Sequence, residues 1–179
     1  MKDVFHELYE KYHHDLFRFL FYMVKDRSLA EDLVQDVYVK VLKSFHSFKG
    51  ESSEKTWLYS IARHVAIDYL RKQKRKKRRV MDVFNWDDKG DFIPDEKPLP
   101  EEIAQKNEEI GKMYQCLHQC TIDQQSVVIL RYIQMLSIQE TADVLGWTES
   151  KVKTTQHRAI KTLKKIMKGD EGGMHYEAR

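Results

Sequence analysis

Residues 54–79 read EKTWLYSIARHVAIDYLRKQKRKKRR, and the periodicity of this stretch decides the fold of the first half of the chain. At 100° per residue its apolar side chains form one helical stripe, made of Leu58, Ile61, Ala62, Val65 and Tyr69. The opposite face carries Ser60, Arg63, His64, Ile67 and Arg71. It leads into residues 71–79, where eight of nine residues are basic. We therefore expect a long helix that buries one face and offers the other, with an exposed Ile67, to a polyanion.

The loop before this helix interleaves aromatic and cationic side chains. Its aromatic residues are Phe45, Phe48, Trp57 and Tyr59, and its cations are Lys49 and Lys55. Bases of a single-stranded nucleic acid stack on aromatic rings while the phosphates bind cations, so the pattern favours a nucleic-acid partner. The alternative is that each aromatic residue belongs to the core, and we expect Trp57 to be partly buried.

Two further helices are predicted before this loop. Apolar residues recur at helical spacing from Phe5 to Met23. Ser28 and Glu31 form a capping-box pattern that predicts a second helix from about residue 29. The buried side of that helix collects Ala30, Val34, Val37, Tyr38 and Val41, and the side that faces away collects Asp32, Gln35, Asp36 and Val39. The chain has no alternating strand pattern of useful length, so we expect an all-α protein.

Proline and charge divide the chain into two small helical domains. All three prolines fall within residues 85–102, and residues 82–102 hold eight acidic side chains against two lysines, a net charge of −6. Because the whole chain carries +3, the remainder sums to +9, which favours a polyanionic partner for the basic parts. We expect a helical domain at 1–80, a flexible acidic linker at 81–103, a second domain at 104–168 and a disordered tail at 169–179.

The second domain contains the pattern of a helix-turn-helix. Ser137 and Glu140 form a capping box, Gly146 permits a tight turn, and Thr148 caps the helix that follows. The buried stripe of that last helix is Val152, Ala159, Leu163 and Ile166. Its far side carries Thr154, His157, Arg158, Lys161, Lys164, Lys165 and Lys168. A basic, hydroxyl-bearing face opposite a small buried residue is typical of a recognition helix in the major groove of DNA, although a solvated lysine-rich helix would share part of the pattern.

The sequence contains no recognisable motif for catalysis or metal binding. It has no glycine-rich phosphate loop and no nucleophile elbow. Cys116 and Cys120 lack the second pair of ligands that a zinc site needs, so we expect two small apolar residues on a buried helix face. The start of the chain is acidic where a secretory signal would be apolar, and the apolar cluster at 16–24 is too short to span a bilayer. We expect a cytoplasmic protein that is not an enzyme, binds no cofactor and does not insert into a membrane.

Two stretches resemble bacterial extracytoplasmic-function sigma factors of RNA polymerase. Residues 30–75, AEDLVQDVYVKVLKSFHSFKGESSEKTWLYSIARHVAIDYLRKQKR, resemble conserved region two of that family. Residues 126–163, SVVILRYIQMLSIQETADVLGWTESKVKTTQHRAIKTL, resemble region four. The resemblance implies a dissociable initiation subunit that binds the bacterial RNA polymerase core, selects promoters, helps to open the duplex and leaves after initiation.

The resemblance also implies roles for particular residues. Polymerase core binding maps to Asp32, Leu33, Gln35, Asp36 and Val39. Recognition of the downstream promoter element, with its melted non-template strand, maps to Phe48, Lys49, Ser52, Ser53, Lys55, Thr56, Trp57, Arg63, His64, Ile67, Asp68 and Arg71. Recognition of the upstream element, as duplex promoter DNA, maps to Lys151, Lys153, Thr154, Thr155, His157, Arg158 and Lys161.

The same resemblance implies a further partner and a role for the acidic linker. Family members are commonly held inactive by an anti-sigma factor. Their linker threads into polymerase channels, where an acidic strand can mimic nucleic acid; a passive tether is the alternative.

The chain departs from the family pattern at several positions. The usual Leu-Pro that opens region four is Cys120–Thr121 here, and the arginine that the family has a few residues later is Gln125. Thr155–Gln156 replaces a common basic–apolar pair, and Lys151 replaces a common threonine. These departures leave the fold prediction intact and bear on the preferred upstream sequence.

Two rival functions remain at this point. A stand-alone helix-turn-helix regulator would bind duplex DNA and never contact polymerase. It gives no reason for the outward acidic face at residues 32–39 or for the aromatic loop. A nucleic-acid enzyme is disfavoured, because the sequence has no constellation of metal ligands or catalytic bases.

Overall fold

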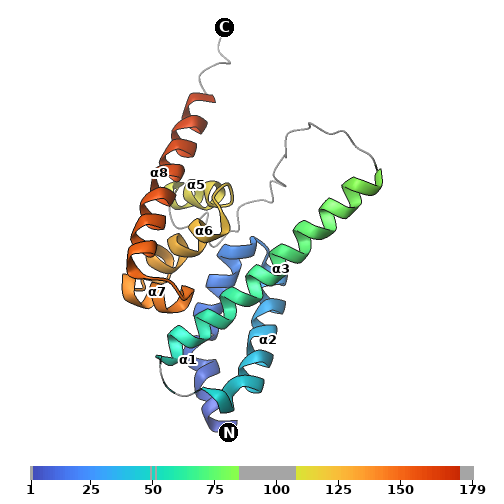
Figure 1. Cartoon of the computed structure of the whole chain (residues 1–179), viewed down its shortest axis with the longest axis vertical. Helices are drawn as coiled ribbons and strands as arrows, with labels where there is room; N and C mark the ends of the chain where they lie inside the picture. The colour runs from blue at the N-terminus through green and yellow to red at the C-terminus, as the bar shows by residue number, and fades with distance from the viewer. Residues whose placement is uncertain (1, 49, 51, 85–107, 174–179) are drawn as a thin grey trace.

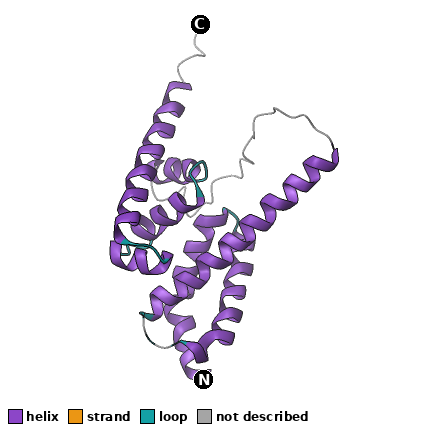
Figure 2. Ribbon diagram, viewed as in Figure 1, coloured by secondary structure: helices purple, strands orange, loops and turns teal. Residues whose placement is uncertain are grey.

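The computed structural model describes residues 2–48, 50, 52–84 and 108–173, and every regular element within these ranges is a helix (Figure 2). The predicted all-α fold is therefore confirmed. The helices of residues 2–84 form the N-terminal module, and those of residues 108–173 form the C-terminal module. Figure 1 shows the first in blue to green and the second in yellow to red.

The N-terminal module is a bundle of three helices. These are α1 (Lys2–Val24), α2 (Arg27–Ser44) and α3 (Glu54–Phe84), with a short 3₁₀ turn, η1 (Phe45–Ser47), after α2. The predicted apolar stripes meet at its centre, where side chains no more than 2% exposed include Leu16, Phe19, Val34, Val37, Leu58 and Ala62. Burial contributes about 25 cal/mol for each Å² of apolar surface removed from water, so these stripes hold the three helices together.

Helix α2 begins two residues earlier than predicted and is capped by a different residue. Asp26 has extended backbone angles (φ −140°, ψ 123°), and its carboxylate accepts a hydrogen bond from the Leu29 backbone N–H at 3.0 Å. Ser28 lies inside the first turn, so the predicted Ser28–Glu31 capping box is wrong. Asp caps a helix as well as Ser does, and the left-handed Lys25 (φ 58°) turns the chain just before it.

Helix α3 extends beyond the stretch 54–79 that predicted it. It begins at Glu54, where the Ser53 hydroxyl accepts a hydrogen bond from the Thr56 backbone N–H at 3.1 Å and caps the first turn. It continues to Phe84, so the first residues of the predicted linker at 81–103 belong to this helix. The remainder of that linker lies outside the described residues, and the domain boundaries stay a prediction.

The C-terminal module contains five helical elements within its described range. They are α5 (Glu108–Leu117), α6 (Ile122–Val128), a π-helical turn η2 (Ile129–Ile133), α7 (Ile138–Leu145) and α8 (Glu149–Gly173). Helix α8 passes residue 168, so residues 169–173 of the predicted disordered tail are helical, and 174–179 lie outside the described residues. Sequence periodicity did not predict the π turn, which places Gln134 at the end of η2.

The predicted helix-turn-helix signals are confirmed. The Ser137 hydroxyl accepts from the Glu140 N–H at 3.1 Å, and the Glu140 carboxylate accepts from the Ser137 N–H at 2.7 Å. Gly146 ends α7 with φ 65° and ψ 36°, a left-handed conformation that glycine adopts without steric cost. The Thr148 hydroxyl accepts from the Lys151 N–H at 3.2 Å and caps α8. These local contacts fix how α8 leaves the turn.

The two modules pack against one another. Helix α3 contacts α7, and α1 contacts the π turn η2. In Figure 1 the C-terminal module lies along α1 and the first half of α3. The Tyr59 hydroxyl of α3 donates to Gln134, just after η2, at 2.8 Å, and Arg63 of α3 pairs with Asp123 of α6 at 3.1 Å. This packing covers one face of α3 that the sequence predicts to be open.

Candidate nucleic-acid interface

Helix α8 presents the face that was predicted for it. Val152 and Ala159 are fully buried and Leu163 is 7% exposed, which holds α8 against the module. The polar far side is exposed along its whole predicted length, comprising Thr154, His157, Arg158, Lys161, Lys164, Lys165 and Lys168. Lys151 and Lys153 are also exposed, whereas Thr155 is half-buried. The geometry suits contact with phosphates and base edges in a major groove.

An arginine that the sequence reasoning missed ties α8 to the preceding turn. Arg131 lies in η2, and its Nε donates to the Gln156 side-chain oxygen at 3.0 Å. Its Nη1 donates to the Leu136 backbone oxygen. Gln156 stands where the resembled family commonly has an apolar residue. This departure was the one sequence signal that could have indicated a polar contact here. The Arg131–Gln156 contact fixes the rotation of α8 against the rest of the module.

The aromatic loop before α3 is partly as predicted. Phe48 stacks on Trp57 with ring centroids 4.6 Å apart and planes 28° apart, and Phe45 lies 6.4 Å from the same ring. Ser52 and Ser53 are exposed, whereas Lys55 is half-buried and Thr56 is 6% exposed. Lys49 lies outside the described residues. For Tyr59 the core alternative holds: its ring is 1% exposed and packs on Phe19 of α1, and its hydroxyl donates to Gln134.

The prediction of an exposed Ile67 is also wrong. Ile67 is only 7% exposed and lines a groove of about 920 Å³ beside α3. The groove has basic or polar α3 side chains on one wall: Arg63, His64, Asp68, Arg71, Lys74 and Lys77. The other wall comes from the C-terminal module and includes His118, Ile122 and Asp123. Helical periodicity identified the face correctly, but it could not show that a second module lies opposite.

Arg63 takes part in the contact between the two modules. Its Nη2 donates to the Asp123 carboxylate at 3.1 Å, and its side chain is 11% exposed. Its guanidinium carbon lies 5.8 Å from the centroid of the Trp147 ring. Burial lowers the pKa of Arg63 from its usual value, and Asp123 opposes that shift. Of the remaining residues assigned to this face, His64, Asp68 and Arg71 are exposed.

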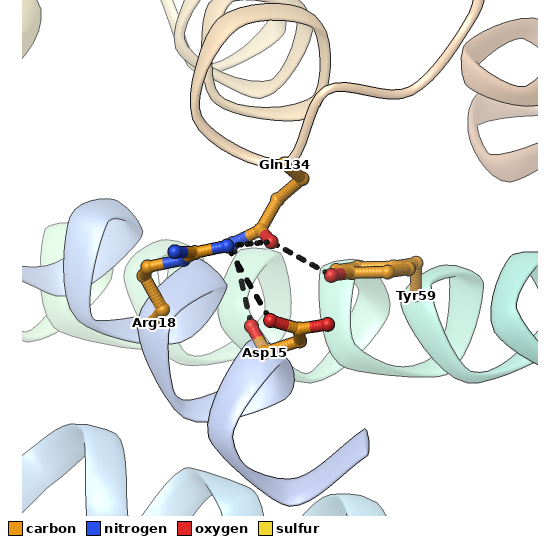
Figure 3. Close-up of polar contacts among 4 residues, drawn as sticks. All are labelled: Asp15, Arg18, Tyr59 and Gln134. Carbon is orange, nitrogen blue, oxygen red and sulfur yellow. Dashed lines mark hydrogen bonds and ion pairs between the residues drawn. The ribbon is translucent and has the colours of Figure 1, made fainter. Parts of the chain in front are cut away.

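The buried side-chain amide of Gln134 connects the C-terminal module to α1 and α3 (Figure 3). The Gln134 side-chain oxygen accepts from the Tyr59 hydroxyl at 2.8 Å and from Arg18 Nη2 at 3.2 Å. Its nitrogen donates to the Asp15 backbone oxygen at 3.3 Å. Arg18 also pairs with the Asp15 carboxylate at 3.3 Å, and burial raises the pKa of Tyr59. We call these four residues the Gln134 hub; no local sequence signal predicted it.

The outward face of α2 is exposed as predicted, with one qualification. Asp32, Gln35 and Asp36 are exposed, and Val39 is 48% exposed. Leu33 is only 4% exposed, and it lines a groove of about 330 Å³ between α2 and α3 together with Asp36 and Val39. A partner that occupied this groove would reach Leu33 at its floor.

The titratable groups within the described ranges form no cluster that could bind a metal ion. Cys116 and Cys120 are buried free thiols, as expected for small apolar residues. Among the described residues, no three His, Cys, Asp or Glu side chains are arranged to hold a metal ion. Burial, with Lys25 nearby, lowers the pKa of His118 to about 3. Within the same residues, no helix combines the length and the apolar character needed to cross a bilayer.

Both modules match families of known proteins. Residues 8–76 match the Sigma-70 region 2 family, and residues 110–163 match Sigma-70 region 4. The ECF RNA polymerase sigma factor SigX of Bacillus subtilis (strain 168) is 55% identical over 93% of this chain and 85% of its own length. RNA polymerase sigma factor YlaC of the same organism is 37% identical over 93% of both chains. The sigma factor RpoE, co-crystallised with the anti-sigma factor NepR from Bartonella quintana, superimposes with a TM-score of 0.70 at 25% identity, over 94% of this chain and 98% of that one.

Proposed function

This chain belongs to the ECF sigma factors of bacterial RNA polymerase, and from this premise we propose how its residues divide the selection of a promoter. As a sigma factor it directs the polymerase core to specific promoters and initiates transcription. The chemistry of RNA synthesis resides in the polymerase, so this chain acts without catalytic residues or a cofactor of its own. Because its partner works on the chromosome, it functions in the cytoplasm.

The C-terminal module reads the upstream promoter element through α8. The observation that carries this proposal is the unbroken exposed face of α8 from Lys151 to Lys168. Arg158 and His157 point from it as candidate base readers, and the lysines further along hold phosphates. Phosphate contacts of this kind release counterions, so binding weakens steeply with added salt.

The N-terminal module recognises the downstream element and helps to separate its strands. The stacked Phe48 and Trp57 rings offer a platform for unpaired bases, and the exposed hydroxyls of Ser52 and Ser53 lie beside it in the chain. His64 and Arg71 continue the interaction along α3 toward the basic run at 71–79. Taking a base out of the stack costs a few kcal/mol, which such contacts offset.

The outward face of α2 binds the polymerase core. Asp32 and Asp36 are exposed, and neither forms an ion pair among the interactions described above. A partner that combined cations with an apolar side chain would complement these carboxylates and the groove beside Val39. The two modules, from about 1–80 and 104–168, are thus proposed to act on DNA while anchored through α2.

We also propose that an anti-sigma factor holds this chain inactive when it is not needed. The structurally similar RpoE was crystallised with such a partner, and the two chains align over both modules. Purification of the tagged chain from its own cells, with and without an inducing stress, tests this. Recovery of the same inhibitory protein only before induction supports the proposal, and a chain that never carries an inhibitor contradicts it.

Run-off transcription with purified core polymerase tests the proposed function as a whole. Core enzyme and this chain together should start RNA at defined sites of a genomic promoter library, whereas core enzyme alone should not. A stand-alone DNA-binding regulator would bind promoter fragments but would fail to capture core polymerase in a pull-down. Binding to DNA without any binding to the core would therefore favour that rival.

A further inference from the structure

We propose that the groove beside α3 binds a nucleoside polyphosphate, with its phosphates along α3 and its base against the C-terminal module. This ligand site goes beyond the recognition of promoter DNA proposed above. It rests on three features that meet in one groove: a row of cations, a set of apolar side chains and a buried amide oxygen without a hydrogen-bond partner among the described residues.

The groove has the dimensions of a small-molecule site. Its volume is about 920 Å³, and pockets for cofactors and drug-sized ligands measure about 300–1,000 Å³. A lone phosphate or carboxylate would fill only a small part of this space. One wall comes from α3 and the other from residues 118–125, so a ligand in the groove would contact both modules.

The α3 wall of the groove attracts anions. The lysine and arginine side chains that line the groove are Arg63, Arg71, Lys74 and Lys77. Its two aspartates already have cationic neighbours, since Asp123 pairs with Arg63 at 3.1 Å and Asp68 lies 4.0 Å from Lys40 of α2. The negative charge inside the groove is therefore matched, and positive charge remains for a ligand.

The remaining cations lie in a row along α3. Arg71 and Lys74 are exposed, and neither forms an ion pair within the described ranges. Arg71, Lys74 and Lys77 follow one another at intervals of three residues, which spans about 9 Å along the helix axis. Successive phosphates can accept charge-assisted hydrogen bonds from successive cations, whereas a ligand with one anionic group would engage only one of them. The row therefore fits a chain of phosphates.

The rest of the groove suits a neutral ring system. Burial, with Lys25 nearby, lowers the pKa of His118 to about 3, so this imidazole is uncharged at neutral pH. Ile122 on the same wall is half-buried, and Ile67 and Leu70 of α3 also line the groove. A nucleobase would cover these apolar side chains, whereas inorganic polyphosphate would leave them uncovered.

Gln125 supplies a polar group that can select the base. The residue lines the groove and is 6% exposed, and its Nε2 donates to the Cys120 backbone oxygen at 2.9 Å. Its Oε1 is buried and has no hydrogen-bond partner in the part of the chain that the structure describes. An unsatisfied buried acceptor is costly, and an exocyclic amino group of the base would satisfy it by donating an N–H. The site therefore favours a base such as adenine.

The ligand should compete with the melted promoter strand. Arg71 and His64 line the groove and also belong to the α3 face assigned to the downstream element. A nucleotide whose phosphates engage Arg71 would occupy a cation that the strand needs. This consequence rests on the proposed function, whereas the ligand site itself does not.

Calorimetric titration of the full chain with three probes tests the site. The probes are ATP, inosine triphosphate, in which a carbonyl replaces the amino group of the base, and inorganic tripolyphosphate, which has no base. ATP should bind, and each of the other two should bind about ten-fold or more weakly, because each lacks a contact that the site offers. ATP should also displace a single-stranded oligonucleotide that carries the non-template downstream element.

Two variants identify the groove as the place of binding. Lys74→Glu should weaken ATP binding about ten-fold or more, because it reverses a charge in the row of cations. Lys76→Glu is the matched control, since it makes the same change on an exposed α3 residue that does not line the groove. Gln125→Leu should abolish the preference for ATP over inosine triphosphate. Melting curves without ligand establish that each variant is folded, and the comparison of probes on the wild-type chain needs no variant.

The contrary outcomes are distinct. Absence of ATP binding would overturn the proposal. Equal weakening by Lys74→Glu and Lys76→Glu would show diffuse attraction to the basic run and no defined site. Equal affinity of the wild-type chain for ATP and tripolyphosphate would show that the base is not recognised. ATP binding without displacement of the oligonucleotide would remove the link to the promoter. None of these titrations contains polymerase, so the proposed function fails separately, by absence of run-off transcription.

Discussion

Helices α8 and α3 each carry a basic face opposite an apolar stripe. The two basic faces differ in what lies against them. The buried side of α8 packs on its own module, and nothing described lies over Arg158 or Lys161. The equivalent side of α3 faces a second module, whose Asp123 pairs with Arg63 and leaves that side chain 11% exposed. The comparison teaches that amphipathic spacing finds the functional face of a helix but does not reveal whether that face is free.

The largest effect on stability should come from placing a charge on the buried side of α8. Ala159 is fully buried, so Ala159→Glu places an unpaired charge in the core and should destabilise the C-terminal module by about 3–5 kcal/mol. Lys161→Glu, on the exposed side two residues away, should leave the melting temperature nearly unchanged. Differential scanning calorimetry of both variants makes the comparison. Equal destabilisation would mean that α8 has no free face.

A second test uses the exposed face of α2. Asp36→Arg should weaken binding to core polymerase by about 100-fold or more, because it places a like charge against a partner selected for carboxylates. Glu10→Arg makes the same charge change on an exposed residue of α1 and serves as the control. Fluorescence anisotropy with labelled core measures both affinities, and circular dichroism checks the fold. Retained binding by Asp36→Arg would remove α2 from the proposed polymerase interface.

The third test separates two kinds of contact on α8. Arg158→Ala should cost about 1–3 kcal/mol on the preferred upstream sequence and relax specificity at one base pair. Lys164→Ala should weaken binding to all sequences about equally and reduce the salt dependence by about one counterion. Titrations of duplexes with single base-pair changes, at several salt concentrations, measure both quantities. A uniform loss for Arg158→Ala would make it a phosphate contact instead.

The smallest effect is expected at the contact that sets the rotation of α8. Gln156→Leu removes the 3.0 Å bond to Arg131 and should cost about 1 kcal/mol of stability, because a partly exposed hydrogen bond of this kind contributes that much. Arg131 keeps its bond to the Leu136 oxygen, which limits the loss. Chemical denaturation measures the change. A variant at least as stable as the wild-type chain would show that this hydrogen bond does not stabilise the module.

The parts of the fold that depend on neighbouring residues were predictable. The Ser137–Glu140 capping box, the left-handed Gly146 and the buried Ala159 all act within one or two helical turns, and all three are confirmed. The Ser28–Glu31 prediction failed for an equally local reason, since Asp26 offered a second good cap two residues earlier. The choice between two adjacent caps depends on how the preceding helix ends, which sequence spacing does not specify.

The contact between the modules was not predictable from spacing. The Tyr59 hydroxyl meets a residue 75 positions away, and the Gln134 nitrogen meets one 119 positions away. Nothing near either residue in the sequence indicates its partner. Ile67, which was predicted to be exposed from the N-terminal helices alone, is 7% exposed and lines the groove between α3 and the C-terminal module. The roles of individual residues on both DNA-binding faces and on α2 stay predictions.

The π turn η2 gives the contact between the two modules a simple genetic control. A π turn holds one residue more than the α-helix that would replace it, and Gln134 follows it directly. Deleting one codon within residues 129–133 would restore α-helical spacing and rotate Gln134 by about 100°, away from Arg18 and Tyr59. A change in length at this turn thus alters the contact between the modules and leaves every side chain of α3 and α8 unchanged.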